Sequence, residues 1–211
     1  MTTAERPVTL ARKYDRAASR WRDKMRALGY YDAYLGFLSE PGTRPASGGR
    51  VIDVGAGTAA FAEAWVAVNG MPEDLLLVDL SQAMLERGRS MLGRRGVNAR
   101  ISAAALGPGM TVEPADEVLA AHLIEHIPDP LGALCDLKAL LKPGGRLRLV
   151  VSKPHWCNAI IWLKWRHRTF ALGEMRGLLA NAGLDIEAEY DFPSGPPSRT
   201  SRGFVARLAE K

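Results

Sequence analysis

The chain has 211 residues, of which 47% are hydrophobic and 24% are charged, and its net charge is +5. This composition excludes collagen-like and low-complexity chains, and the length favours a single domain over residues 1–211. No apolar stretch reaches the roughly 18 residues that a membrane-spanning helix needs, and residues 1–9 lack the apolar run of a secretory leader. Cys135 and Cys157 fit no metal or disulfide framework, so we expect a cytoplasmic protein. The positive charge indicates attraction to anions, but it does not choose between acidic lipid, nucleic acid and an anionic substrate.

Two helices are predicted ahead of the first strand. Residues 9–28 carry an apolar stripe at spacings of three and four, formed by Leu10, Tyr14, Ala17, Trp21, Met25 and Leu28. A row of basic residues four apart, from Arg12 to Lys24, is more typical of a solvated face than of a binding site. A second helix follows Gly29 and ends at Pro41-Gly42. We therefore expect residues 1–40 to be a helical segment that precedes the sheet.

Strands then alternate with helices. The predicted strands lie at 50–55, 74–80, 98–102, 116–122 and 145–152, and the predicted helices at 59–68, 82–93 and 131–141. The continuous apolar runs LLLV and LRLVV are typical of strands that are buried on both faces. This alternation predicts an α/β fold with a doubly wound, mostly parallel sheet and helices on both faces.

The C-terminal part follows another pattern. GEMRGLLANAG (173–183) reads as a helix with a glycine stop, and LDIEAEYDF (184–192) as a strand. PSGPPS is interpreted as a turn and GFVARLA (203–209) as a second strand. Because a short turn joins these two strands, they must pair in the antiparallel sense.

The stretch VIDVGAGTAA (51–60) predicts a strand that runs through a glycine turn into a helix. Gly55 and Gly57 let the backbone turn tightly and let a ligand approach it closely. With Ala60 they satisfy a loose dinucleotide fingerprint, which is a weak signal alone. Asp79, at the end of the second strand, is placed to accept hydrogen bonds from ribose hydroxyls. These features serve an NAD enzyme and other nucleotide-binding proteins equally.

Asp53 distinguishes between a cofactor with an anionic pyrophosphate and a cationic cofactor. A carboxylate beside a pyrophosphate would repel it, whereas a cationic ligand would be attracted. S-adenosylmethionine carries an ammonium and a sulfonium as well as a ribose, so Asp53 can bind the ammonium, directly or through water, while Asp79 holds the ribose. The alternative is that Asp53 caps the turn by accepting hydrogen bonds from backbone N–H groups.

Four segments in this order resemble the class I S-adenosylmethionine-dependent methyltransferases, over roughly residues 45–190. They are VIDVGAGTAAFAEAW, VDLSQAMLERGR, DEVLAAHLIEHIPDP and LKPGGRLRLVVSKP. The resemblance is nearest to the small-molecule group that includes the ubiquinone and menaquinone enzymes. It implies a seven-stranded Rossmann-like sheet ending in an antiparallel hairpin. It also implies S-adenosyl-L-methionine as cofactor and a helical lid formed by residues 1–40.

The resemblance also implies which residues hold the cofactor: Tyr14, Asp53, Gly55, Ala56, Gly57, Asp79, Leu80, Met84, Ala104 and Ala121. Two positions depart from the family pattern. Ala59 stands where the family often has a further glycine, and the segment SAAAL (102–106) lacks the usual Asp that bonds the adenine amino group. If Ala103 or Ala104 takes that place, cofactor affinity is expected to fall by about 1–2 kcal/mol, the net contribution of one such hydrogen bond.

Methyl transfer from a sulfonium needs positioning above all, and a general base only if the acceptor must lose a proton. The candidate catalytic residues are His122, His126 and His155, at the ends of the fourth and fifth strands, where ligands bind in open α/β sheets. On a helical turn His122, Glu125 and His126 would share one face, and the letters H-x-x-E-H match a zinc pattern. Because the pattern belongs on a long helix and here ends a strand, we expect no metal and a packing role for Glu125 and His126.

The segment PHWCNAIIWLKWRHRTF (154–170) is the candidate acceptor-binding region. Its Trp156, Trp162 and Trp165 can line an apolar pocket, lie at a membrane surface beside Arg166 and Arg168, or form a core helix. The N-terminal YDRAASRW resembles a segment with which relatives cover the cofactor, so Tyr14 and Trp21 would be lid residues. The predicted substrate-binding residues are Trp21, Trp156, Trp162 and Arg166.

These features together predict a methyltransferase for a small, apolar or amphipathic acceptor, with a quinone-type or lipid-headgroup enzyme at the membrane surface as the alternative. Nucleic acid is not an expected partner, because HLIE stands where an N/D-P-P-Y/W tetrapeptide would be. An NAD oxidoreductase and a non-catalytic nucleotide-binding module remain alternatives from other classes. The oligomeric state and the acceptor atom do not follow from the sequence.

Overall fold

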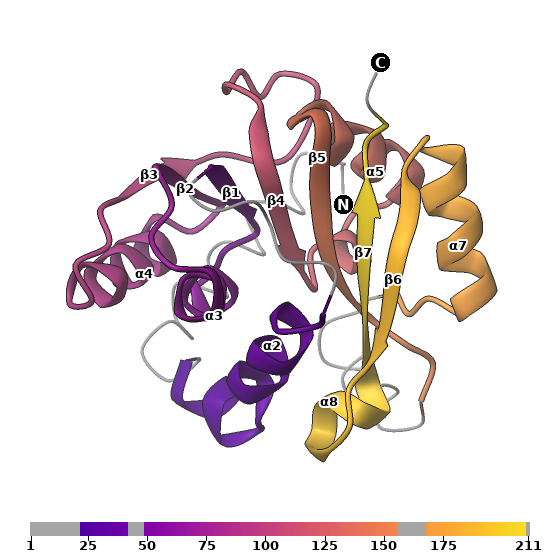
Figure 1. The fold of residues 1–211 in the computed structure, drawn as a ribbon, viewed down its shortest axis with the longest axis horizontal. Helices are drawn as coiled ribbons and strands as arrows, with labels where there is room; N and C mark the ends of the chain where they lie inside the picture. The colour runs from indigo at the N-terminus through magenta and orange to yellow at the C-terminus, as the bar shows by residue number, and fades with distance from the viewer. Residues whose placement is uncertain (1–21, 42–48, 156–167, 210–211) are drawn as a thin grey trace, which may run out of the picture.

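The computed structural model describes residues 22–41, 49–155 and 168–209, which form a seven-stranded sheet flanked by helices (Figure 1). The strand order is β3-β2-β1-β4-β5-β7-β6. The strands are β1 (Arg50–Val54), β2 (Asp74–Asp79), β3 (Ala99–Ala103), β4 (Ala115–Ala121), β5 (Leu141–Ser152), β6 (Asp185–Asp191) and β7 (Ser201–Arg207). Strands β1 to β5 pair in parallel, whereas β7 pairs antiparallel with β5 and β6. The prediction of a mostly parallel α/β sheet with an antiparallel end is confirmed.

Side-chain caps mark the start of two helices. The helices are α2 (Tyr30–Leu38), α3 (Ala60–Asn69), α4 (Gln82–Gly93), α5 (Pro130–Ala139), α7 (Leu172–Asn181) and α8 (Gly195–Thr200), with a 3₁₀ turn η1 (Ile124–His126). The hydroxyl of Ser81 accepts the backbone N–H of Met84 at 3.2 Å, and Asp129 caps α5 ahead of Pro130. Such caps satisfy N–H groups that a helix start leaves without partners.

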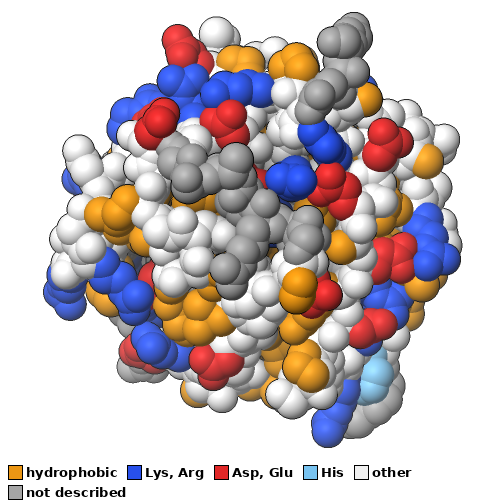
Figure 2. All heavy atoms as spheres, viewed as in Figure 1, with side chains coloured by type: hydrophobic (Ala, Val, Ile, Leu, Met, Phe, Trp, Pro, Cys, Tyr) orange, Lys and Arg blue, Asp and Glu red, His pale blue; other side chains and the backbone are white. Residues whose placement is uncertain are grey.

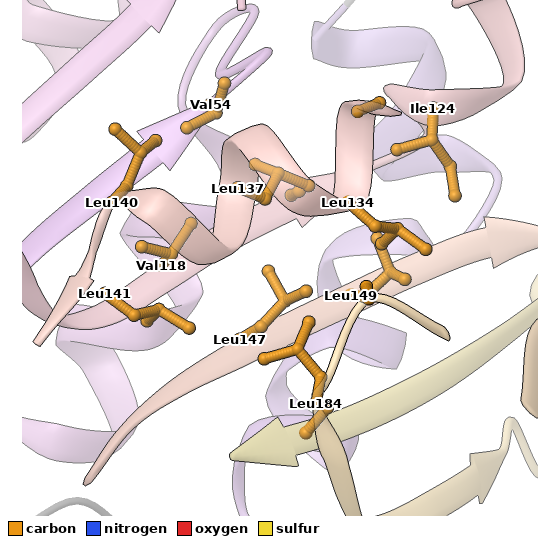
Figure 3. Packing of buried hydrophobic residues seen from close by; sticks show 14 of the residues in the cluster. Val54, Val118, Ile124, Leu134, Leu137, Leu140, Leu141, Leu147, Leu149 and Leu184 are labelled. Carbon is orange, nitrogen blue, oxygen red and sulfur yellow. The ribbon is translucent and has the colours of Figure 1, made fainter. Parts of the chain in front are cut away.

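Two hydrophobic clusters cover the two faces of the sheet. On one face α5 and α7 pack on alternate residues of the strands, and Figure 3 shows Leu134 and Leu137 of α5 above Val118, Leu147 and Leu149. On the other face α2, α3 and α4 pack on the intervening residues, which include Val51, Leu75, Leu77, Leu119 and Val150. Alternation of this kind follows from the two-residue period of a strand.

Several local predictions differ from the structure, and among them β7 is Ser201–Arg207 instead of 203–209. PSGPPS contains the short helix α8 rather than only a turn, because Pro196 and Pro197 lie in its first turn, where their fixed φ suits a helix and their missing N–H costs nothing. β5 begins at Leu141 instead of residue 145, with an irregular register opposite Ala115–Glu117. Of the helix predicted at 9–28, residues 22–27 are helical and 9–21 lie outside the described residues. Within the described ranges, no helix is long and apolar enough to cross a membrane.

Candidate active site

The turn between β1 and α3, here called the cofactor turn (residues 55–59), is held by its backbone. The N–H groups of Gly55 and Ala56 both donate to the carbonyl of Val78 on β2, at 2.8 and 3.0 Å. Gly55 and Gly57 have φ values of 72° and 51°, a backbone region that residues other than glycine rarely adopt. A Cβ added to Gly57 would meet no atom of the described residues within 4 Å. Within that part of the chain, the turn leaves an open face on which a ligand can approach the backbone.

Ala59 also has a left-handed backbone, with φ of 59°, at the N-cap of α3. The glycine that the family often has there would adopt this conformation without strain, whereas alanine adds a methyl group. Gly88 on α4 accommodates that methyl, because a Cβ at Gly88 would lie 2.8 Å from the Cβ of Ala59. The departure at Ala59 is thus matched by a small residue on the neighbouring helix.

Asp79 stands at the edge of the cofactor turn. Its carboxylate accepts the N–H of Gly57 at 2.9 Å and the N–H of Ser81 at 2.8 Å. A carboxylate has several lone pairs, so accepting these backbone N–H groups is compatible with accepting a ribose hydroxyl. The next residue, Leu80, exposes 37% of its surface, which is unusual for a large apolar side chain in this fold. An open glycine turn, a carboxylate and an exposed apolar side chain together fit a nucleoside with its ribose and base.

Asp53 lies beneath the same turn and is 1% exposed. Its Oδ2 accepts the N–H of Ala62 in the first turn of α3 at 3.2 Å, which is the capping role that the sequence left as an alternative. Burial raises the pKa of Asp53 to about 7; the hydrogen bond from Ala62 opposes this, and the charge of Asp79 adds to it. A cation placed beside Asp53 would restore its charge, so the contact to Ala62 and an ammonium contact are compatible.

The residues expected near adenine take different positions. The N–H of Ala104 donates to the carbonyl of Asp79 at 3.1 Å, and Ala103 pairs with Asp79 across β3 and β2. The structure thus brings the end of β3 beside Asp79, the carboxylate that is predicted to bind the ribose. Ala56 and Ala121 are half-buried. Met84 is fully buried, so it offers no open surface to a ligand as the side chains stand.

A polar network surrounds His122, immediately after β4. Its Nδ1 lies 3.0 Å from Oε1 of Glu125 and 3.2 Å from the hydroxyl of Ser152, and its Nε2 lies 3.5 Å from the hydroxyl of Ser201. The ring also meets the ring of Tyr30 edge-on, with centroids 5.5 Å apart. His122 has φ of 55°, so its backbone departs from the strand at the point where the ring enters this network. We call His122, Glu125, Ser152 and Ser201 the histidine network.

Glu125 anchors the histidine network from below. Its side chain is 1% exposed, and Oε1 also accepts the N–H of Ser152 at 2.7 Å. Burial acts to raise the pKa of Glu125, but the hydrogen bond and charge of His122 and the backbone N–H groups outweigh burial and lower it. A carboxylate that stays charged beside Nδ1 holds a proton there and leaves Nε2 as the acceptor nitrogen.

Comparison with known proteins decides the family. A family model described as "Methyltransferase domain" matches residues 13–189. The chain belongs to the class I S-adenosylmethionine-dependent methyltransferases. It is therefore an enzyme that uses S-adenosylmethionine.

Curated relatives of this methyltransferase act in quinone biosynthesis by name. The chain is 32% identical over 105 residues to a ubiquinone biosynthesis O-methyltransferase of Xylella fastidiosa, which covers 49% of this chain and 42% of the relative. It is 30% identical over 142 residues to a ubiquinone/menaquinone biosynthesis C-methyltransferase of Azotobacter vinelandii, and this match covers 65% of this chain and 55% of the relative. The matches to the first relatives span only 42 to 64% of their lengths.

Solved structures share the fold. One is the 1,6-didemethyltoxoflavin-N1-methyltransferase of Burkholderia thailandensis with its substrate and S-adenosylhomocysteine bound, at a TM-score of 0.76 and 19% identity, covering 100% of this chain and 92% of that chain. Another is the magnesium protoporphyrin IX methyltransferase of Synechocystis PCC 6803 with bound S-adenosylhomocysteine. Its TM-score is 0.75 and its sequence identity is 14%, and the match covers 97% of this chain and 100% of that chain. At these identities the likeness establishes the fold alone.

The structure separates the three histidines that were predicted to be catalytic. His122 is in the histidine network, whereas His126 belongs to η1, where its N–H donates to the carbonyl of Leu123 at 3.1 Å. His155 lies three residues beyond the end of β5 and is half-buried. Among the described residues, no group of three or more His, Cys, Asp or Glu side chains is placed to hold a metal. Independence from metal stays a prediction.

Several predicted residues lie outside the described part of the chain: Tyr14, Trp21, Trp156, Trp162, Trp165 and Arg166. Conversely, sequence reasoning missed four residues that the structure gathers around His122. They are Tyr30, Ser152, Thr200 and Ser201, and the hydroxyl of Tyr30 lies 3.0 Å from that of Thr200. The only local signal was the group of three tyrosines in YYDAY (30–34) on the predicted second helix.

Proposed function

We propose that this methyltransferase transfers the methyl group of S-adenosylmethionine to a small, apolar or amphipathic acceptor whose attacking atom loses a proton to His122. The observation that carries the proposal is the pairing of Nδ1 of His122 with the buried carboxylate of Glu125 at 3.0 Å. A buried carboxylate on one ring nitrogen favours uptake of a proton at the other, which is the arrangement of a general base.

When bound, the cofactor supplies an activated methyl group, so the chain itself has to orient, dehydrate and deprotonate. In this proposal Asp53 pairs with the cofactor ammonium and Asp79 with its ribose. Leu80, Ala56, Gly55, Gly57 and Ala104 form the adenine and turn contacts. Ala121 and His122 continue from β4, which pairs with β1 directly beside the turn. That adjacency supports placing the reacting atoms near His122, at the carboxyl end of the sheet.

The apolar character of the acceptor has separate support. The curated relatives are named for quinone biosynthesis, whose intermediates combine a polar ring with an apolar chain. We also propose a single domain over residues 1–211, with residues 1–40 as its lid, a cytoplasmic location and no nucleic-acid substrate.

Replacing His122 tests the proposal. His122→Asn suits the left-handed backbone, which Asn tolerates, and removes the base. With phenolic and quinol-type acceptors as probes, formation of S-adenosylhomocysteine should fall by about 10²- to 10⁴-fold. Calorimetric affinity for S-adenosylhomocysteine should stay unchanged. An unaltered rate in His122→Asn, or full loss of activity with EDTA restored by one divalent ion, would overturn the base assignment.

A membrane-surface enzyme for quinones or lipid headgroups is the second candidate, favoured by the names of the relatives and the net charge of +5. It predicts that the protein sediments with anionic vesicles in a salt-sensitive way, and that Trp162→Ala weakens this. If the parent protein does not bind vesicles, the membrane-surface candidate is rejected and the first proposal, with a soluble acceptor, is kept. Titration with NADH in place of S-adenosylmethionine checks the oxidoreductase alternative.

A further inference from the structure

Two tyrosines one turn apart on α2 differ in what their hydroxyls contact. Tyr30 is 8% exposed and Tyr34 is 6% exposed, so both rings are buried. The hydroxyl of Tyr30 lies 3.0 Å from that of Thr200. The hydroxyl of Tyr34 forms no hydrogen bond with any of the described residues, and its ring contacts are with Tyr30 and Phe61. The Tyr34 oxygen is not among the described side-chain atoms that are both sealed from solvent and without a partner, so water or a ligand can reach it. Tyr34 therefore offers a hydrogen-bond donor that a ligand could engage.

The surroundings of Tyr34 indicate which part of a ligand is near. Phe61 is the second residue of α3, and the next residue, Ala62, donates its N–H to Asp53. Burial raises the pKa of Tyr34 well above its usual value, and the charges of Tyr30, Asp53 and Glu125 add to this in that order. The phenol thus keeps its proton at neutral pH, and it lies near enough to Asp53 to sense its charge.

We propose that the phenol of Tyr34 donates a hydrogen bond to the carboxylate at the amino-acid end of S-adenosylmethionine. The assignment rests on the proposed placement of the cofactor ammonium beside Asp53. Ammonium and carboxylate share one carbon atom, so a donor close to Asp53 is within reach of the carboxylate. The start of α3 next to Phe61 adds the positive end of a helix, which favours an anion there. In this arrangement Asp53 binds the ammonium of the amino-acid group and Tyr34 binds its carboxylate.

The test compares Tyr34→Phe with Tyr30→Phe, using S-adenosylhomocysteine and 5′-methylthioadenosine as probes. Both probes carry adenine, ribose and sulfur, but the second lacks the amino-acid end. In Tyr34→Phe, affinity for S-adenosylhomocysteine should fall about ten- to a hundredfold, as expected for a hydrogen bond to a charged group, while affinity for methylthioadenosine stays unchanged. The melting temperature should stay constant or rise, because no hydrogen bond to protein is lost. Tyr30→Phe should instead lower the melting temperature and leave both affinities unchanged.

Three results would overturn the assignment. Equal affinity of Tyr34→Phe and the parent for S-adenosylhomocysteine would remove the carboxylate contact; if the acceptor's KM rose at the same time, the phenol would serve the acceptor. A parallel loss of affinity for both probes together with a lower melting temperature would make Tyr34 a core residue. Binding of neither probe to the parent would refute the cofactor site itself. None of these readouts depends on which acceptor is methylated, so a failure of the proposed acceptor chemistry is seen separately.

Discussion

The cofactor end of the site and the acceptor end are held by different kinds of contact. At β1, β2 and β3 the contacts join backbone groups to each other or to a single carboxylate: Gly55 and Ala56 to Val78, Gly57 to Asp79, and Ala62 to Asp53. Around β4, β5 and β7 the contacts join side chains to side chains, as in the histidine network. The contacts at the first end join residues up to about 22 positions apart, such as Gly57 and Asp79. The histidine network joins His122 to Glu125 three positions away, and also to Ser152 and Ser201, which are 30 and 79 positions away.

This difference has a consequence for function. The backbone-built end can be kept by any sequence that preserves the glycines and two carboxylates, and it serves a cofactor that is constant across the family. The side-chain end can change with one substitution at a time, and in the proposed function it faces the acceptor. Substitutions should therefore affect cofactor binding or turnover, and seldom both.

Removing Asp79 should have the largest effect on the cofactor end. Asp79→Ala loses the ribose contacts and also releases the N–H groups of Gly57 and Ser81. Affinity for S-adenosylhomocysteine, measured by calorimetry, should fall by about 2–4 kcal/mol, allowing for partial replacement by water. Asp79→Asn retains one acceptor oxygen and should lose less. An unchanged affinity in Asp79→Ala would remove the ribose assignment.

A methyl group added on α4 should disturb the cofactor turn from outside the site. A Cβ at Gly88 would lie 2.8 Å from the Cβ of Ala59 and 3.2 Å from the carbonyl carbon of Thr58. Gly88→Ala should cost about 1–3 kcal/mol of stability and weaken cofactor binding as well. Gly93→Ala, on the same helix but with nothing within 4 Å, is the matched control and should leave both unchanged or raise stability slightly. Similar melting curves for the two variants would show that α4 does not support the turn.

Protonation of Asp53 should change when the cofactor binds. Its pKa of about 7 means that roughly half of the protein carries this proton at pH 7, and an ammonium beside it should release the proton. The binding enthalpy of S-adenosylmethionine at pH 7 should therefore vary with the ionisation enthalpy of the buffer, and Asp53→Asn should abolish the variation. The absence of a buffer effect in the parent would place the ammonium elsewhere.

The same carboxyl group should affect stability with a definite sign. Its pKa is raised in the fold from 3.8, so the folded state holds the proton more tightly. The stability that this proton contributes is fully present below about pH 4 and is lost as the pH rises through 7. Asp53→Asn should therefore raise the melting temperature relative to the parent more at pH 8 than at pH 5. The reverse order would contradict the raised pKa.

The smallest effect is expected at Leu80. Its exposed surface would be covered by the base of the cofactor, so Leu80→Ala should weaken S-adenosylhomocysteine binding by about 1 kcal/mol or less. Met71 is the other large apolar side chain that is exposed within the described residues, at 54%, and it lies ahead of β2, at the opposite end of that strand. Met71→Ala should leave affinity unchanged. Equal small losses in both variants would remove Leu80 from the site.

Much of the fold followed from periodicity. The order of strands and helices was predicted, and α4 was predicted with the bounds that the structure has, because Ser81 and the apolar spacing mark its start and length. The errors lie where short-range signals are ambiguous, as in PSGPPS, whose prolines suit both a turn and the first turn of a helix. The antiparallel pairing of β6 and β7 was still predicted correctly, because the connection between these two strands is short.

The site divides in the same way. The cofactor turn and Asp53 were found from the contiguous motif VIDVGAGTAA, and Asp79 was found separately, as the carboxylate at the end of the second strand. Glu125 was placed beside His122 from the letters H-x-x-E-H, but Ser152 and Ser201 were not found, because Ser201 is 79 positions away and meets His122 only through the pairing of β7 with β5. Tyr34 gave no signal as a single letter, since what sets it apart is a hydroxyl that forms no hydrogen bond with the described residues while its ring packs against Tyr30 and Phe61.

The outer edge of the sheet affects how copies of this protein meet in a concentrated solution. On the edge strand β6, the exposed residues Asp185, Glu187, Glu189 and Asp191 are all acidic, and three of them pair with arginines at Arg146, Arg176 and Arg202. Acidic and basic side chains lie intermixed at the right of Figure 2, where Figure 1 places β6 and α7. An incoming strand would have to displace these charge pairs before it could form hydrogen bonds with the edge, which discourages the growth of sheets between molecules. The arginine beside each carboxylate lowers the pKa of Glu189 and Asp191, so this protection should persist into moderately acidic solution and weaken only when those carboxylates take up protons.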